Sequence, residues 1–180
     1  DDVRVTSDDT STIDAASVAA TVGLAFSGSA AISGAVAVTL TENVLNGTHR
    51  AAIAGSDVTA TTGAIDVLAT ASNTITSTGV AVSLSIAGSG GAGIAAAVTG
   101  VTARNALGNT LEASITGGSA DAGSNVTVSA TDISTIEATN VSASASVGVG
   151  GSAGVGASVS VTLAENVIGS NTIATIDGTD

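Results

Sequence analysis

The chain has 180 residues and carries 15 acidic side chains against three arginines and no lysine, which gives a formal net charge of -12. Hydrophobic residues make up 44%, but only one residue is aromatic, and Cys, Pro, Met, Trp and Tyr are absent. The missing cysteines exclude a disulfide framework, a thiolate metal site and a cysteine nucleophile. An acidic chain without aromatic stacking platforms is also a poor partner for nucleic acid.

The first third of the chain predicts four strand regions. β-branched residues dominate them, Gly, Ser, Asn and Asp separate them, and helical periodicity is absent. The expected regions are Val3–Ser7 running on to Ile13, Ser17–Phe26, Ala31–Leu40 and Arg50–Ala60. The sequence therefore predicts an all-β fold.

Three uncharged stretches, 15–41, 67–103 and 138–164, are each long enough to cross a bilayer as a helix. Within the first of them, however, the large residues occupy even positions from Val18 to Phe26, which is the period of a strand. Gly-Ser breaks inside the stretches indicate turns. We therefore expect no membrane span.

The second and third strand regions are separated by a glycine-rich turn, which predicts a hairpin. Its expected register places Phe26 opposite Ile32 and Val22 opposite Val36. One face of this ribbon is then aliphatic, and the other carries mostly Ala, Ser, Thr and Gly. The small residues would allow another sheet to approach closely, so we expect both faces to be covered.

Self-comparison reveals three copies of one unit. Residues 3–20 match 65–82 and 126–143, and residues 39–55 match 101–117 and 162–178. The offsets are 62 and then 61 residues. The predicted repeats are 1–62, 63–123 and 124–180, the last slightly truncated, and together they form one continuous elongated array.

The architecture predicted for this array is an elongated β-solenoid, with stacked β-sandwich-like units as the alternative. A single solenoid turn, or rung, of 61 residues would enclose more space than these small side chains fill. Each copy is therefore expected to supply two or three rungs, or one rung plus the hairpin. Neither end resembles a polar cap, which predicts that the chain is cut from, or assembles into, something longer.

One asparagine recurs at the same place in all three copies, and a charged residue precedes it each time. These structural repeat positions are Asn43, Asn105, Asn166, Glu42, Arg104 and Glu165. The asparagines could contact a ligand or glycan, but a turn residue or a stacked amide ladder is the favoured interpretation. If equivalent positions align along the long axis, the arginine lies between the two glutamates.

The sequence offers no candidate catalytic, cofactor-binding or metal-ligating residue. The segment 90–98 is close to a nine-residue calcium repeat, but Ala95 occupies the aspartate position. Asp8 with Asp9, and Asp121 alone, do not supply the six to eight oxygens that calcium needs, so only adventitious calcium is expected. His49 occurs in the first copy alone and is expected at the surface.

The glycine-rich aliphatic segments joined to motifs such as ENVLNGT resemble tandem repeats of giant bacterial secreted and cell-surface adhesin-like proteins. The resemblance implies an extracellular location, calcium-associated secretion in some relatives, and a role in adhesion, matrix or filament building. Ala95 departs from the calcium pattern. No functional residue carries over.

The function expected from the sequence is that of a non-catalytic structural segment of an extracellular filament, adhesin stalk or biofilm matrix. Its partners would be further copies or adjacent repeats, joined end to end through β-strands. The alternatives are a calcium- or carbohydrate-binding surface module and, less favoured, a polysaccharide-acting β-helix enzyme. An enzyme would need a groove with clustered Asp, Arg and aromatic residues, and the sequence contains no such cluster.

Overall fold

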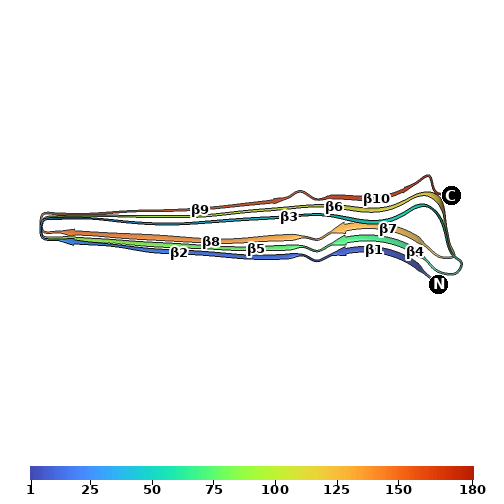
Figure 1. Ribbon diagram of the computed structural model, residues 1–180, viewed down its shortest axis with the longest axis horizontal. Coiled ribbons are helices and arrows are strands. Elements are labelled where there is room, and N and C mark those ends of the chain that lie inside the picture. The colour runs from blue at the N-terminus through green and yellow to red at the C-terminus, as the bar shows by residue number, and fades with distance from the viewer.

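The computed structural model covers residues 1–180 and contains ten β-strands and no helix. All-β architecture is therefore confirmed (Figure 1). The strands are β1 (Val3–Asp9), β2 (Thr12–Ser27), β3 (Ala30–Ala60), β4 (Ile65–Ala71), β5 (Thr74–Ser89), β6 (Ala92–Ala122), β7 (Val126–Asp132), β8 (Thr135–Gly150), β9 (Ala153–Ile168) and β10 (Asn171–Asp177). The third and fourth predicted regions of the first copy are parts of one continuous strand, β3.

The strands form three parallel sheets. Their orders are β1-β4-β7, β2-β5-β8, and β3-β6 followed by both β9 and β10 on the far side of β6. Val3 pairs with Ile65, and Ile65 pairs with Val126, so the registers are 62 and 61 residues, the offsets found by self-comparison. Each backbone is thus hydrogen-bonded to the equivalent segment of the neighbouring copy. Parallel sheets of this kind are consistent with a β-helix or solenoid-like fold.

Each copy runs out along two successive strands and makes one return, which is a single long strand in the first two copies and β9 followed by β10 in the third. The expectation of two or three rungs per copy was wrong. It assumed that one turn would enclose a wide interior, whereas Figure 1 shows the outgoing and returning strands lying close together at the end that carries the turns between β2 and β3 and moving apart toward the termini. Where the two layers lie close together, small side chains such as Ala81 and Ser85 fill the space between them.

The predicted hairpin between the second and third strand regions was also wrong. β2 and β3 belong to different sheets, so Phe26 and Ile32 are not hydrogen-bonded partners; they pair with Gly88 and Ile94 of the next copy. The Gly28–Ser29 turn is therefore an arch between two sheets. Backbone groups that a hairpin would have used are taken by the neighbouring copies.

The faces of the two sheets are assigned by side-chain size. Small residues point inward: Ala81 and Ser85 are 0% exposed, and the Ser85 hydroxyl donates to that of Ser33 in the opposite sheet over 2.9 Å. A Cβ added to Gly23 would lie 2.3 Å from the carbonyl oxygen of Gly34, so the sheets approach closely there. The covered face is the small one, and the aliphatic face points outward.

A conventional apolar core occupies the other half of the molecule. Ile65 and Val67 of β4 pack there against Leu111 and Ile115 of β6, and all four are fully buried. They belong to the second copy, which lies between the first and the third. The outer copies are more exposed because each is hydrogen-bonded on one side only.

The returning segments bend at one position that recurs in every copy, within β3 and β6 and directly after β10. Gly55, Gly117 and Gly178 occupy it with φ values of 56, 62 and 58°, in the left-handed region that favours glycine. The bend lies in the half of the molecule that holds the termini (Figure 1).

The longest dimension of the molecule follows the strands, and equivalent positions align across it, in the hydrogen-bonding direction (Figure 1). The sequence analysis had placed that alignment along the long axis. The structure has no helix long and apolar enough to cross a membrane.

Candidate functional site

The recurring asparagines form a ladder between the sheets. The Asn43 side-chain nitrogen donates to Asn105 Oδ1 over 2.7 Å, and the Asn105 nitrogen donates to Asn166 Oδ1 over 2.8 Å. Asn105 is fully buried and Asn43 is 9% exposed. They lie within strands β3, β6 and β9, so the turn-residue interpretation was wrong, and the amides bond one another as in cross-β structures.

The preceding positions form a charged row on the outer face of the same strands. Arg104 lies between the two glutamates, 3.6 Å from Glu42 Oε1 and 3.6 Å from Glu165 Oε2. All three side chains are more than half exposed. Each such pair contributes about 0–1 kcal/mol, so the row favours in-register pairing more than it stabilises the fold.

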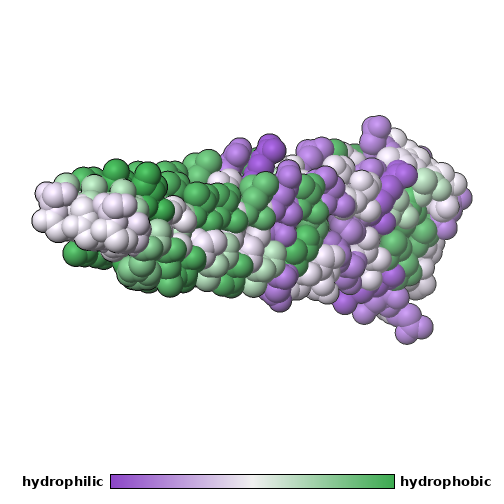
Figure 2. Space-filling view, turned by 60° about the vertical axis from the view of Figure 1, so that its left-hand side comes forward, coloured by the Kyte–Doolittle hydropathy of each residue, from purple (hydrophilic) through white to green (hydrophobic).

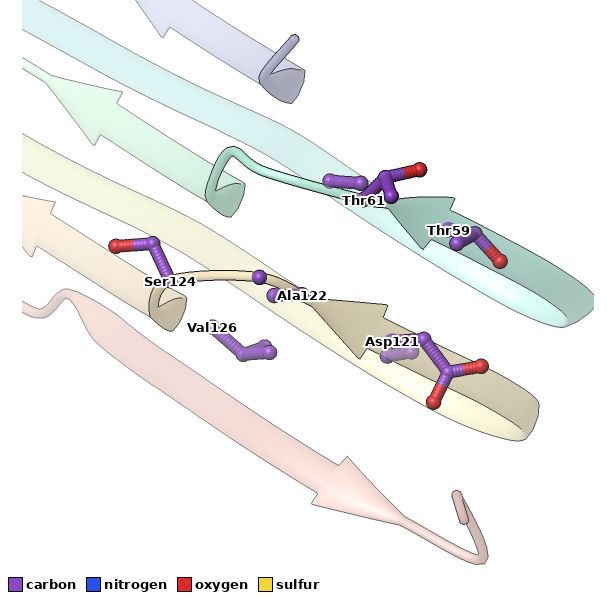
Figure 3. Close-up of a pocket in the computed structure, with 9 residues that line it drawn as sticks. Thr59, Thr61, Asp121, Ala122, Ser124 and Val126 are labelled. Atoms are coloured by element: carbon purple, nitrogen blue, oxygen red, sulfur yellow. The ribbon is translucent and has the colours of Figure 1, made fainter.

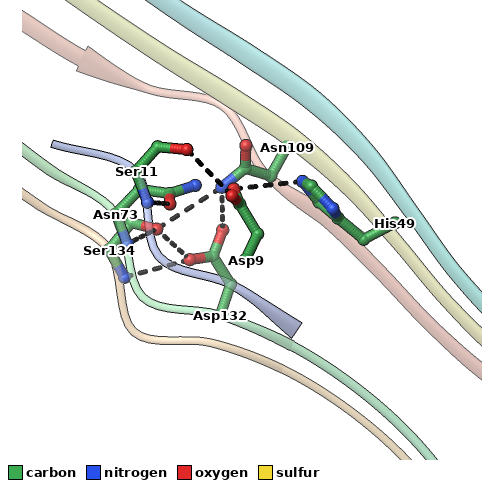
Figure 4. Close-up of polar contacts among 7 residues, drawn as sticks. All are labelled: Asp9, Ser11, His49, Asn73, Asn109, Asp132 and Ser134. Carbon is green, nitrogen blue, oxygen red and sulfur yellow. Dashed lines mark hydrogen bonds and ion pairs between the residues drawn. The ribbon is translucent and has the colours of Figure 1, made fainter. Parts of the chain in front are cut away.

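A second polar cluster lies between the sheets where the outgoing strands are interrupted (Figure 4). It runs through all three copies: Ser11 N–H donates to Asn73 Oδ1 over 2.7 Å, and Asn73 N–H donates to Ser134 Oγ over 3.1 Å. The cluster satisfies backbone groups that the break in each sheet would otherwise leave without partners.

In the first copy this cluster includes an Asp-His pair. His49 Nε2, from β3, lies 3.2 Å from Asp9 Oδ2, and both side chains are less than one-fifth exposed. His49 thus points between the sheets, and the expectation of a surface histidine was wrong. Burial raises the pKa of Asp9. Hydrogen bonds from Ser11 and Asn73 and the attraction of His49 together outweigh burial, so the pKa of Asp9 is below its usual value.

In the third copy Asp132 occupies the position equivalent to Asp9. Its carboxylate accepts hydrogen bonds from the Ser134 backbone N–H and hydroxyl and from the Asn109 amide. Burial raises the pKa of Asp132, but hydrogen bonds from Ser134, Ser170 and Asn109 outweigh it, so the pKa is lowered overall. The two carboxylates therefore act as hydrogen-bond acceptors that hold the strand breaks together.

The one pocket of the molecule is an open depression in the half that holds the termini, called the base half below. It lies next to the loops that lead from β3 to β4 and from β6 to β7 (Figure 3). It is lined by Thr59, Ala60, Thr61, Ala120, Asp121, Ala122, Gly123, Ser124 and Val126. Asp121 is the single titratable residue among them, so no acid–base pair is present. This depression has neither the paired carboxylates nor the aromatic platform that polysaccharide hydrolysis uses.

No group of three or more His, Asp or Glu side chains is placed to hold a metal ion. Asp8 and Asp9 diverge: Asp8 points outward and accepts a hydrogen bond from the Thr70 hydroxyl, whereas Asp9 points inward to His49. The structure therefore brings together the repeat positions of the ladder and the charged row.

The most extensive surface feature is apolar. Figure 2 shows hydrophobic side chains covering the half of the molecule that carries the arches, and hydrophilic ones concentrated toward the other half. The large aliphatic and aromatic side chains there are strongly exposed, for example Val18 at 76%, Phe26 at 73% and Leu40 at 71%. The 15–41, 67–103 and 138–164 segments that build this arch half contain no charged residue.

Sequence reasoning missed the interior polar cluster and misassigned the exposed aliphatic face. The cluster had a signal, since Asp9 and Asp132 occupy equivalent positions and Ser11, Asn73 and Ser134 do so as well. The aliphatic face had one too, because its residues alternate with Ala, Ser and Gly. What pattern alone could not decide is which of the two faces the fold covers.

The chain matches no family model, no curated protein and no solved structure.

Proposed function

We propose that this chain is a non-catalytic structural segment of an extracellular bacterial filament, adhesin stalk or matrix protein, built as a flattened β-solenoid with one rung per repeat. The observation that carries the proposal is the stacking of equivalent residues in register through all three copies. Asn43, Asn105 and Asn166 in the interior and the Glu42–Arg104–Glu165 row outside both follow it. Continuous parallel pairing between copies supports a solenoid over separate sandwich-like units.

The open edges support assembly along the stack. β2 and β3 are each hydrogen-bonded to one neighbour only, as are β8 and β9 on the opposite side. Such edges offer backbone N–H and C=O groups to any matching strand, and the chain lacks the Lys and Pro residues that usually protect them. The edge of a first copy fits that of a third, which is a heterologous contact and gives open fibres rather than closed dimers.

The structure offers no catalytic constellation or metal cluster that would favour a different class of function. The extracellular location rests on the resemblance of the repeats to secreted adhesin-like proteins. Absence of turnover is expected with any polysaccharide.

The test is sedimentation velocity at rising protein concentration, with electron microscopy of the same samples. The wild-type chain is expected to form filaments that grow in the hydrogen-bonding direction. Ala19→Lys places a charge between the sheets on the open edge of the first copy, where an incoming rung must lie, and should stop growth. Ala20→Lys, one residue along on the outer face, is the matched control and should still grow. A chain that stays monomeric, or Ala19→Lys filaments like those of wild type, would overturn the proposal.

A further inference from the structure

We infer that the outer face of β3, β6 and β9 in the arch half binds the same face of a second molecule of this chain. The face is defined by ten large aliphatic side chains, each between 41% and 76% exposed: Ile32, Val36, Val38, Leu40, Ile94, Val98, Val155, Val159, Val161 and Leu163. This apolar face does not depend on the edge-to-edge assembly proposed above, because it uses side chains rather than strand edges.

The size of the apolar face is sufficient for an interface. From the spacing of residues along strands and of strands in a sheet, residues 30–41 and their equivalents in the other two repeats together cover about 600 Å² on each chain. Two such faces together bury about 1,200 Å², the lower end of the range for specific stable interfaces. Monomeric proteins rarely leave contiguous apolar patches larger than a few hundred Å² in water.

The distribution of charge sets the orientation of the two copies. All 18 charged side chains lie outside the three arch segments, so the net charge of -12 is confined to the base half. Two chains packed with their strands in the same direction would bring their charged halves together and repel each other. Packed with strands antiparallel, they overlap arch on arch and place the bases at opposite ends.

The relief of the apolar face fits this antiparallel packing. The row of Val36, Val98 and Val159 crosses the three strands at the centre of this face. On one side of it lies a row of small residues, Gly34, Ala96 and Ala157, and on the other side lies the row of Val38, Gly100 and Val161. A two-fold axis running along the stack through the row of Val36 places Val38 over Gly34 and Leu40 over Ile32. In the two outer repeats a ridge then meets a groove, in the middle repeat Gly100 faces Ala96, and every repeat faces the same repeat of its partner.

A lipid surface is the other occupant that an apolar face of this kind could have. If the arch half entered hydrocarbon, the unpaired backbone groups of the edge strands would lose their hydrogen-bond partners, because no water is present there. Packing against a second copy leaves those edges in water or paired with a further rung. The backbone therefore favours a second copy.

Val36→Lys tests the inference at the centre of the interface, because the axis sets two lysines against each other. Val36 is 61% exposed, so the variant can fold with its charge in water. Its matched control is Thr48→Lys, an exposed position on the same outer side of β3 in the charged half. Both are made with Ala19→Lys, which removes edge assembly, and folding is checked by circular dichroism. Sedimentation should give a dimer that Val36→Lys weakens at least tenfold and Thr48→Lys leaves unchanged.

Cross-linking provides a second readout that does not depend on a destabilising charge. The chain has no cysteine, so Val36→Cys and Thr48→Cys each introduce a single thiol. A bismaleimide with a reach of about 10 Å, the spacing of stacked sheets, should join two Val36→Cys chains but not two Thr48→Cys chains. Equal cross-linking of both variants, or a chain that stays monomeric, would overturn the inference. So would flotation with phosphatidylcholine vesicles that dissociates the dimer, since lipid would then be the preferred occupant.

Discussion

The side-chain amide of Asn43 donates a hydrogen bond to Asn105 over 2.7 Å, although 62 residues separate the two in sequence. Asn105 passes the same interaction on to Asn166, so each amide is satisfied only when its neighbouring copy is in register. A one-residue slip would remove these bonds and turn every side chain to the opposite face.

Replacing Asn105 should therefore destabilise the fold. Asn105→Ala leaves the buried nitrogen of Asn43 without an acceptor, and an unsatisfied buried group costs about 1–3 kcal/mol. The free energy of unfolding is measured by urea denaturation. Asn171→Ala, at an exposed position of β10, is the control and should change it little. Equal effects of the two substitutions would contradict a role for the ladder.

Arg104 should influence stability through charge alone, because its side chain is 58% exposed. Arg104→Gln is expected to cost no more than about 1 kcal/mol, as for other exposed pairs. Arg104→Glu sets three glutamates in one row and should cost more at low ionic strength, with most of the difference recovered in 1 M salt. Urea denaturation at both salt concentrations measures this. A penalty for Arg104→Glu that salt does not reduce would show that packing, not charge, is responsible.

Asp9 and Asp132 make the fold sensitive to acid. Their pKa values are lowered in the folded chain from the usual 3.8, so their contribution to stability is fully present above that value. It is lost as the pH falls through the lower folded-state values. Asp132→Asn should be less stable than wild type at neutral pH but should lose less stability as the pH falls below about 4.

Asp57→Asn, which replaces an exposed carboxylate of β3, is the control for this pH dependence. Its stability should fall with pH as steeply as that of wild type. If Asp132→Asn also retains the full acid dependence, the hydrogen bonds from Ser134 and Asn109 do not hold the carboxylate as described.

Much of the repeat geometry could be predicted from the sequence, and the reason is physical. The 62- and 61-residue offsets are also the registers of the parallel strands, because identical segments satisfy one another's backbone groups and side chains best when aligned. That alignment set Arg104 between Glu42 and Glu165. The number of rungs per copy could not be predicted in the same way, because it depends on how closely two sheets approach.

The interior cluster could not be predicted because its members are brought together across the sheets. His49 reaches Asp9 from a strand whose partners in its own sheet are other copies, and no spacing in the sequence encodes that contact. Which face of β2 and β3 is covered was misjudged for a related reason. Large aliphatic residues are normally buried, and here they are exposed while Ala, Ser and Gly are covered.

The covered small-residue face and the exposed aliphatic face can be compared at two adjacent residues of β6. Ala97 points between the sheets and is 1% exposed, whereas Ala96 points outward. Ala97→Leu forces the closely packed sheets apart and should destabilise the fold by about 1–3 kcal/mol or more, because overpacking a tight interior is costly. Ala96→Leu adds the same atoms to the outer face and should leave the free energy of unfolding of the monomer within about 0.5 kcal/mol of wild type. Urea denaturation at low protein concentration, where face-to-face association is negligible, compares the two. If Ala97→Leu proved as stable as Ala96→Leu, the small residues would not be what allows the two sheets to lie so close together.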